Sequence, residues 1–403
     1  MKIEPGPSVP VVRGFRFSGV HGGLKSRGRR DFALIVADHP AVCASAFTRN
    51  AAVAAPVIVA REHAADGAAQ AVMVNSGNAN AGTGEKGVKF AQWGCRELAG
   101  RLSIDPQLVI PCSTGVIGVE LEKVPFARAI SLGVDGLSRR GFPAAARAIM
   151  TSDAFPKWVS RTVKVGAGEA VVAGMAKGAG MIHPNMATMI AVVVTDAGLS
   201  LAAARAIMDR AVAGSFNRIS VDGDTSTNDT VILLASGEAP GGRVDDPGSL
   251  EYRAVDGAVG AVMGELARMI VRDGEGATKV VDVVVRGARD DDQAERLVRA
   301  IANSALVKCA FAGADPNWGR IVMAAGNAGV EFDPTRLAVD VDDVALVRDG
   351  SLVSPQAAHM ARKVMRGDAF SVFVTVGKGG GSATVVTSDL TEEYVRFNSA
   401  YTS

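Results

Sequence analysis

The chain has 403 residues, 48% of them hydrophobic and 21% charged, a balance typical of globular proteins with a sizeable core and two or three domains. Its net charge of +1, from 43 basic and 42 acidic residues, excludes the strongly basic surface of a nucleic-acid-binding protein. The 4 cysteines lack C-x-x-C spacing and have no accompanying histidine cluster, which argues against a metal centre and fits a reducing compartment.

The N-terminal residues 1–12 contain neither a long apolar segment nor a small-residue cleavage site. The apolar run 190–194 is far too short to cross a bilayer. We therefore expect a cytoplasmic protein without a membrane segment. The densest basic stretch, from Lys25 to Arg30, is short, and we interpret it as a solvated loop rather than a functional patch.

Valine- and isoleucine-rich apolar runs alternate with helical patterns, which predicts an α/β or α+β architecture. The expected strands, in chain order, are residues 32–36, 71–74, 108–110, 189–194, 231–234, 280–285 and 370–376. The expected helices are residues 85–102, 201–212, 250–272 and 291–303. Ser200 and Ser249 are placed as N-caps of the second and third helices. Residues 245–248, Asp-Asp-Pro-Gly, are expected to form a loop and are a candidate domain boundary.

The most informative segment is residues 174–196, where a glycine-rich loop carrying Lys177 leads to a strand that begins near Thr188. A threonine hydroxyl is a weak nucleophile unless a base lies beside it. Cleavage of the Ala187–Thr188 bond would give Thr188 a free α-amine, which can serve as that base. The same hydroxyl could cause the cleavage by attacking the preceding carbonyl. From this segment alone, an ordinary threonine at a strand edge is the favoured alternative.

Three other features of the sequence could mislead. Residues 222–233 begin like a calcium loop but lack the required glycine and the final acid, so we expect a hydrogen-bonded turn near the site. Residues 377–384 lack the order of a phosphate-binding loop, so a hairpin loop is expected there. His183 lies close to Thr188 in sequence, but no separate base is needed once the amine is free.

Six motifs in register resemble the bifunctional ornithine acetyltransferase / glutamate N-acetyltransferase family of arginine biosynthesis. The motifs occupy residues 75–84, 113–118, 177–189, 215–230, 315–320 and 398–403. They cover nearly the whole chain, and the third is similar to the self-cleavage site of the family. The resemblance implies a ping-pong reaction in which Thr188 takes the acetyl group from N2-acetyl-L-ornithine and passes it to L-glutamate.

The resemblance also assigns roles to individual residues. It places the oxyanion hole at Thr114 and Gly115, where the residues alone favour a tight turn. Substrate binding is carried over to Thr151, Lys177, Thr188, Glu275, Asn398 and Ser403. By composition alone, Lys177 would be a solvent-exposed lysine and Glu275 would be an exposed acid in a loop. Ser403 stands where the family often has threonine, and the hydroxyl is kept. Chain ends usually fray, so a functional tail must fold back over the site.

The family fold is α/β, a mixed-sheet layered fold formed jointly by two autocleaved chains, residues 1–187 and 188–403. The resemblance implies that these α and β chains assemble into a heterotetramer of two α and two β chains. The resemblance implies no cofactor. Acetyl-CoA would serve as a second acetyl donor in the bifunctional members only. We expect small-molecule substrates, and neither nucleic-acid nor membrane partners.

Two other classes of function remain as alternatives. A self-processing amidohydrolase or aminopeptidase would use the same threonine chemistry with water as the acceptor. A non-catalytic oligomeric binding protein would retain the fold without cleavage.

Overall fold

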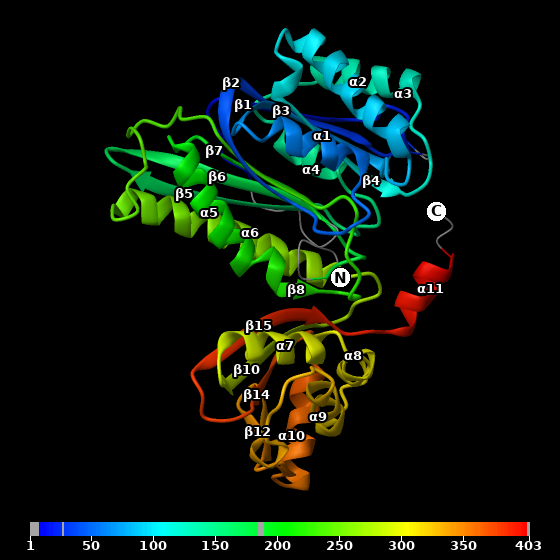
Figure 1. Cartoon of the computed structure of the whole chain (residues 1–403), viewed down its shortest axis with the longest axis vertical. Helices are drawn as coiled ribbons and strands as arrows, with labels where there is room; N and C mark the ends of the chain where they lie inside the picture. Colours follow the sequence, from blue (N-terminus) through cyan, green and yellow to red (C-terminus); the bar gives the residue numbers. More distant parts are fainter. Residues whose placement is uncertain (1–7, 26–27, 184–188, 401–403) are drawn as a thin grey trace.

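The computed structural model describes residues 8–25, 28–183 and 189–400, so Ala187, Thr188 and Ser403 lie outside the described residues. The described chain forms two lobes joined after a long helix (Figure 1). In this part of the chain, no helix has both the length and the apolar character needed to cross a membrane.

The large lobe holds β1 to β9 and α1 to α6. Its strands are β1 (Phe15–Val20), β2 (Phe32–Phe47), β3 (Ala68–Asn78), β4 (Val109–Val116), β5 (Lys157–Val165), β6 (Gly168–Lys177), β7 (Ile190–Thr195), β8 (Ile219–Ser220) and β9 (Thr230–Ala235). Its helices are α1 (Ala55–His63), α2 (Gly84–Leu102), α3 (Lys123–Asp135), α4 (Phe142–Ala148), α5 (Leu201–Gly214) and α6 (Leu250–Arg272).

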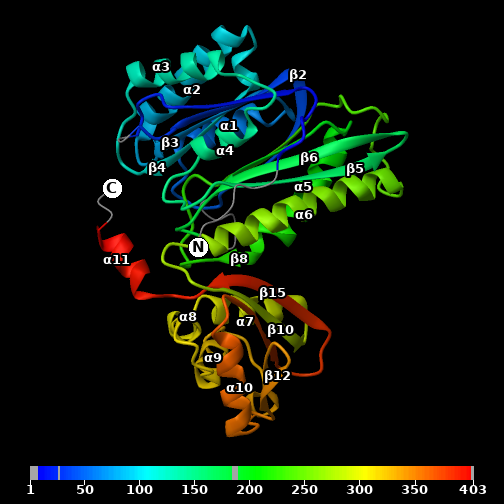
Figure 2. The ribbon, with the colours of Figure 1, turned by 180° about the vertical axis from the view of Figure 1, so that it is seen from behind.

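The strands follow the order β4-β3-β2-β9-β7-β6-β5, with β1 on the free side of β2. The first part of β2 pairs with β3 and its last part pairs with β9, so β2 belongs to two halves of the sheet. The two halves pack face to face: Ile35 of β2 and Val74 of β3 share one apolar core with Val192 of β7. Helices α2 and α3 cover one outer face and α5 and α6 the other, which gives four layers (Figures 1 and 2).

The small lobe is a second mixed sheet with helices packed on one face. Its strands are β10 (Val280–Ala288), β11 (Ala338–Val341), β12 (Val344–Arg348), β13 (Ser351–Leu352), β14 (Ala369–Thr375) and β15 (Gly381–Ser388). Its helices are α7 (Asp291–Ala302), α8 (Ala305–Ala312), α9 (Trp318–Gly326) and α10 (Pro355–Met365), and α11 (Glu392–Ala400) follows the last strand. The short β8 of the large-lobe segment pairs with β15, so the two lobes share backbone hydrogen bonds.

The layered α/β fold predicted from the sequence is confirmed, and the predicted elements are found with shifted ends. Ser200 and Ser249 cap α5 and α6 as expected, because their hydroxyls accept backbone N–H groups of Ala203 and Tyr252. Formation of this fold from two cleaved chains stays a prediction.

Two sequence expectations are wrong. Residues 245–248 are a loop, but not a boundary, because α6 packs against β5 and β6 of the large lobe and the small lobe begins only after it. The glycine-rich residues 377–380 do not close a hairpin. Strand β10 lies between β14 and β15 and pairs with both, parallel to the first and antiparallel to the second. A glycine-rich loop alone does not decide which strands pair, because strand order depends on contacts across the whole sheet.

Candidate active site

The candidate residues gather where the two halves of the large-lobe sheet meet at one end. The C-terminal ends of β3, β4 and β6 lie there beside the starts of β7 and β9. Asn228, just before β9, ties the halves together because its Nδ2 donates to the carbonyls of Ala79 (2.7 Å) and Ser113 (3.0 Å). Asn228 is buried, so these two bonds satisfy an amide that would otherwise be costly to bury.

Lys177 and Thr114 come from motifs 63 residues apart and meet at this end of the sheet. The Lys177 Nζ donates to Thr114 Oγ1 at 3.2 Å, and both side chains are buried. Burial lowers the pKa of Lys177 below its usual value, while the nearby carboxylate of Asp153 acts in the opposite direction. Lys177 is therefore not the solvent-exposed lysine that composition alone favours.

Gly115 has a backbone conformation that requires glycine. Its φ is 134°, and a Cβ added to it would lie 2.3 Å from the carbonyl carbon of Gly77 on β3. The two parallel strands β3 and β4 thus approach closely at their ends, where their register is irregular. Thr114 and Gly115 lie within β4, so the tight turn that the residues alone favoured is wrong, and the backbone donor expected from the family resemblance stays a prediction.

Asp229 was not singled out from the sequence, although it lies in the 215–230 motif. Its Oδ1 accepts the N–H of Met189 at 3.0 Å, and Met189 directly follows Thr188 in the chain. Among the described residues, the other oxygen, Oδ2, has no hydrogen-bond partner and is buried. Burial raises the pKa of this carboxyl well above its usual value, partly offset by the Met189 N–H and by Lys177. A buried acid therefore contacts the backbone next to the predicted nucleophile.

A second buried acid, Asp153, holds the loops around Lys177. Its carboxylate accepts the N–H of Gly178 (2.8 Å) and of Thr151 (2.8 Å) and pairs with Lys157 (2.7 Å). Lys157 also binds Asp273 at the end of α6 at 2.5 Å. Local sequence patterns did not reveal this group, because Asp273 lies far along the chain from Asp153 and Lys157.

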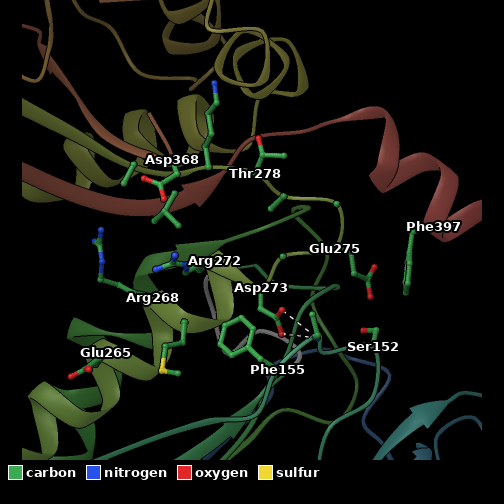
Figure 3. Close-up of a pocket in the computed structure, with 18 residues that line it drawn as sticks. Ser152, Phe155, Glu265, Arg268, Arg272, Asp273, Glu275, Thr278, Asp368 and Phe397 are labelled. Carbon is green, nitrogen blue, oxygen red and sulfur yellow. Dashed lines mark hydrogen bonds between the residues drawn. The ribbon is translucent and has the colours of Figure 1, made fainter. Parts of the chain in front are cut away.

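Glu275 follows α6 and faces the loop after Lys177. Its N–H donates to the Ala179 carbonyl at 2.8 Å. A Cβ on Gly180 would lie 2.5 Å from the Glu275 carboxylate, so a larger residue there would displace this carboxylate. Glu275 is half-buried rather than an exposed loop acid, and it lines a cavity of about 940 Å³ between α6 and the small lobe (Figure 3).

The C-terminal tail returns to the large lobe, as expected. On α11, the Asn398 Nδ2 donates to Glu275 Oε2 at 3.1 Å, and Phe397 lines the same cavity. Figure 3 shows Phe397 on its helix opposite Glu275. The expected contact of Asn398 is thus observed, whereas Ser403 lies beyond the described residues.

The predicted turn at 222–228 is present. The Asp222 carboxylate accepts the N–H groups of Ile182 (2.8 Å) and Asp224 (3.2 Å), and so holds the chain just before residues 184–188. The His183 Nδ1 lies 3.4 Å from the Asn303 amide of the small lobe, so the imidazole is held by that lobe.

The structure thus joins Thr114, Gly115 and Lys177 at one point, next to the start of β7. Glu275 and Asn398 form a second group, whereas Thr151 lines a separate small cavity with Asp153. The buried Lys177, the strand end at Gly115 and the buried Asp229 lie around the start of β7. This arrangement suits acyl transfer by a side-chain nucleophile. Among the described residues, no cluster of histidine, cysteine or acidic side chains is grouped to hold a metal ion.

Comparisons with known proteins agree with the sequence motifs. The model of the ArgJ family matches residues 16–403. A protein of Methylococcus capsulatus, "Arginine biosynthesis bifunctional protein ArgJ", is 45% identical over 393 residues, covering 97% of this chain and 95% of its own. A protein of Geobacter sulfurreducens with the same name is 46% identical over 390 residues, covering 97% of this chain and 99% of its own. A solved chain of the Bacillus halodurans protein of that name is 34% identical, with TM-score 0.49 over 51% of this chain and 96% of that one.

Proposed function

Because the chain belongs to the ArgJ family, we propose that it is a glutamate N-acetyltransferase of arginine biosynthesis that cleaves itself before Thr188. It moves the acetyl group from N2-acetyl-L-ornithine to L-glutamate, and it also accepts acetyl-CoA as a donor. The observation that carries the proposal is the buried bond from Lys177 to Thr114, which joins two distant motifs beside the start of β7.

In the proposed self-cleavage, the Thr188 hydroxyl attacks the Ala187 carbonyl and the peptide nitrogen leaves as an amine. Water then opens the ester. The released α-amine of Thr188 becomes the base that takes the hydroxyl proton when the acetyl donor binds. Ornithine leaves with that proton, glutamate enters, and its amine accepts the acetyl group from the threonine ester. The buried Asp229, bonded to the Met189 N–H, fixes the backbone that carries the nucleophile.

Both half-reactions pass through a tetrahedral oxyanion, which we assign to Thr114 and the backbone of Gly115. The positive φ of Gly115 turns its backbone at the end of β4, and Lys177 holds the Thr114 hydroxyl. Preorganised donors of this kind each lower the barrier by about 3–4 kcal/mol.

Substrate binding is assigned to Lys177, Glu275, Asn398 and Thr151, together with Ser403 and Thr188. Lys177 supplies a cation for a carboxylate, and Glu275 supplies an anion for the side-chain ammonium of ornithine. The Asn398 amide, bonded to Glu275, orients that carboxylate.

The two chains, residues 1–187 and 188–403, are proposed to fold before cleavage. Strands β7 and β9 of the second lie between β2 and β6 of the first. Separation of the fragments would therefore expose the edges of four strands, β2, β9, β7 and β6, and two apolar faces. We propose further that the pairs assemble as a cytoplasmic heterotetramer of two α and two β chains, without a cofactor.

The direct test is acetylglutamate formation by purified protein, with N-acetylornithine and acetyl-CoA supplied separately as donors. We expect product with both, and ornithine released in equal amount with the first. Release of acetate without acetylglutamate would instead indicate an amidohydrolase. The absence of both products would contradict the proposal.

Gly115→Ala tests the oxyanion assignment. The added Cβ would lie 2.3 Å from a carbonyl carbon of β3, so the strand end must shift and the backbone donor with it. We expect kcat for acetyl transfer to fall by about 10²- to 10³-fold. The matched control is Gly118→Ala, in the same loop with open space around its Cβ position, although its φ of 84° adds some strain. Equal kcat losses in the two variants would contradict the assignment.

A further inference from the structure

The chain between β15 and α11 forms a strap, residues 387–391, whose contacts are not used by the reaction described above. The strap leads to α11, which stands at the edge of the molecule (Figure 1). Helix α11 has no buried residue, so it has little apolar packing of its own. Its place beside Glu275 must therefore be fixed by the strap and by the few polar contacts that the helix makes.

The strap carries a buried acid, Asp389, which binds the linker that connects α6 to β10. Its Oδ1 accepts the N–H groups of Thr278 (2.8 Å) and Lys279 (3.0 Å), and its Oδ2 accepts the Thr278 hydroxyl (2.5 Å). Asp389 is only 3% exposed, so these three bonds are shielded from water. A carboxylate that accepts three donors from two adjacent residues fixes that part of the linker against the strap.

A second bond joins the strap to the linker, nearer to Glu275. The Thr391 hydroxyl donates to the carbonyl of Gly276 at 2.6 Å. The two segments approach closely, since Gly276 has a φ of 70° and a Cβ on it would lie 2.4 Å from the backbone nitrogen of Tyr394. Gly276 directly follows Glu275, whose own N–H is bound to the Ala179 carbonyl. Glu275 is therefore held between the large-lobe loop at Ala179 and the strap.

The strap is itself anchored in the small lobe by the buried Lys308 of α8. The Lys308 Nζ donates to Thr387 Oγ1 (2.8 Å) and Ser388 Oγ (3.2 Å), and the Lys308 carbonyl accepts the N–H of Leu390 (3.2 Å). These bonds hold the residues on both sides of Asp389. The small lobe therefore sets the position of the strap, and the strap sets the position of the linker.

We propose that Asp389 and Thr391 are positioning residues that set the preference of the site for an acetyl donor with a positively charged side chain. The inference rests on the proposed function, in which Glu275 binds the side-chain ammonium of ornithine. The two residues act through Glu275 and not on the reacting atoms. They fix the linker that carries Glu275 and, through α11, the Asn398 amide that binds its carboxylate at 3.1 Å. A carboxylate that is already in place binds an ammonium group most tightly, so a loosened linker weakens recognition of that group alone.

The test compares two donors that differ only in the ammonium group: N2-acetyl-L-ornithine, and N2-acetyl-L-norvaline, which has the same carbon chain without the terminal amine. Asp389→Ala should raise KM for N-acetylornithine by about tenfold with little change in kcat, and leave kcat/KM for N-acetylnorvaline within about twofold of wild type. Asp389→Asn should retain most of the preference, because its amide oxygen can still accept the N–H groups of Thr278 and Lys279.

Thr391→Val is the second variant, and it decides alone if Asp389→Ala does not fold. It removes one hydroxyl and should lower the preference for N-acetylornithine by about fivefold, whereas Thr391→Ser keeps the hydroxyl and should restore the preference. The matched control is Asp333→Ala in the small lobe. Asp333 accepts the N–H (2.9 Å) and the hydroxyl (2.6 Å) of Thr335 in the same manner, and its loss should change the kinetics of neither donor.

A double variant with Glu275→Gln separates a positioning role from a structural one. Glu275→Gln should remove most of the preference, and Asp389→Ala added to it should cause no further loss. Equal losses for the two donors, an unchanged preference in Thr391→Val, or full additivity with Glu275→Gln would overturn the inference. Failure of the proposed function is distinct, because the wild type would then form no acetylglutamate from N-acetylornithine.

Discussion

Replacement of Thr188 by alanine is expected to leave a single polypeptide of 403 residues and to lower acetyl transfer by about 10⁴-fold or more. Alanine removes the hydroxyl that attacks the Ala187 carbonyl, so no new α-amine forms. The variant thus loses nucleophile and base together, which explains why the effect should exceed that of any other single change. A denaturing gel checks the cleavage, and acetylglutamate formation checks the transfer.

Thr188→Ser is the matched control, because serine keeps the hydroxyl and acquires the same amine on cleavage. It should give the two fragments, residues 1–187 and 188–403, and retain measurable transfer. Mass spectrometry of wild type trapped with N-acetylornithine should find one extra acetyl group on Thr188, the first residue of the second fragment. An acetyl group on any other residue, or full activity in uncleaved wild type, would contradict the mechanism.

The sequence predicted the layered α/β class and the long helices because these depend on local patterns. The helix of residues 250–272 was placed correctly by its apolar periodicity and by Ser249, which accepts the Tyr252 N–H. The pairing of β10 with both β14 and β15 could not be predicted, because strand order depends on contacts between distant segments. The double role of β2 was missed for the same reason, since only its first residues looked like a strand.

The candidate site was predicted in part. Motifs placed Thr114, Gly115 and Lys177, but only the fold shows that Lys177 is buried against the Thr114 hydroxyl. Asp153 carried no local signal, because its importance lies in contacts with Lys157 and with two backbone loops. Asp229 lay in a recognised motif, yet its contact with Met189 depends on the parallel pairing of β7 with β9. The residues that carry the chemistry could therefore be predicted from local motifs, whereas the buried charged residues that position them could not.

Replacement of Lys157 by methionine is expected to have the second large effect, a loss of stability of the folded protein. Lys157 has no exposed surface and lies between the carboxylates of Asp153 and Asp273, at 2.7 and 2.5 Å. Methionine fits the volume but leaves two buried carboxylates without their cation. We expect a loss of about 3–5 kcal/mol in the free energy of unfolding, measured by urea denaturation at pH 8.

The loss should become smaller as the pH is lowered. In the wild type, burial raises the pKa of Asp273 to about 6, despite the opposing effect of Lys157. The folded pKa exceeds the unfolded value of about 3.9, so this carboxyl stabilises the fold most below about pH 4 and loses that contribution as pH rises through 6. Asp153 behaves oppositely, because Lys157 and Lys177 hold its pKa well below the usual range despite its burial. Without Lys157 both carboxyls should hold protons more tightly, so protonation at pH 5 relieves part of the penalty.

Arg161→Met is the matched control, since Arg161 lies on the same strand β5 and also pairs with an acid, Glu265, but is exposed. Its expected cost is about 1 kcal/mol or less, because exposed pairs are solvated when broken. A large cost that is equal at pH 5 and pH 8 would show that neither carboxyl takes up a proton in this range. If Lys157→Met cost no more than Arg161→Met, the two carboxyls would not be charged in the folded protein. Asp153 would then bind the loops beside Lys177 as a neutral acid, and Lys177 would lack the anion that favours its charged form.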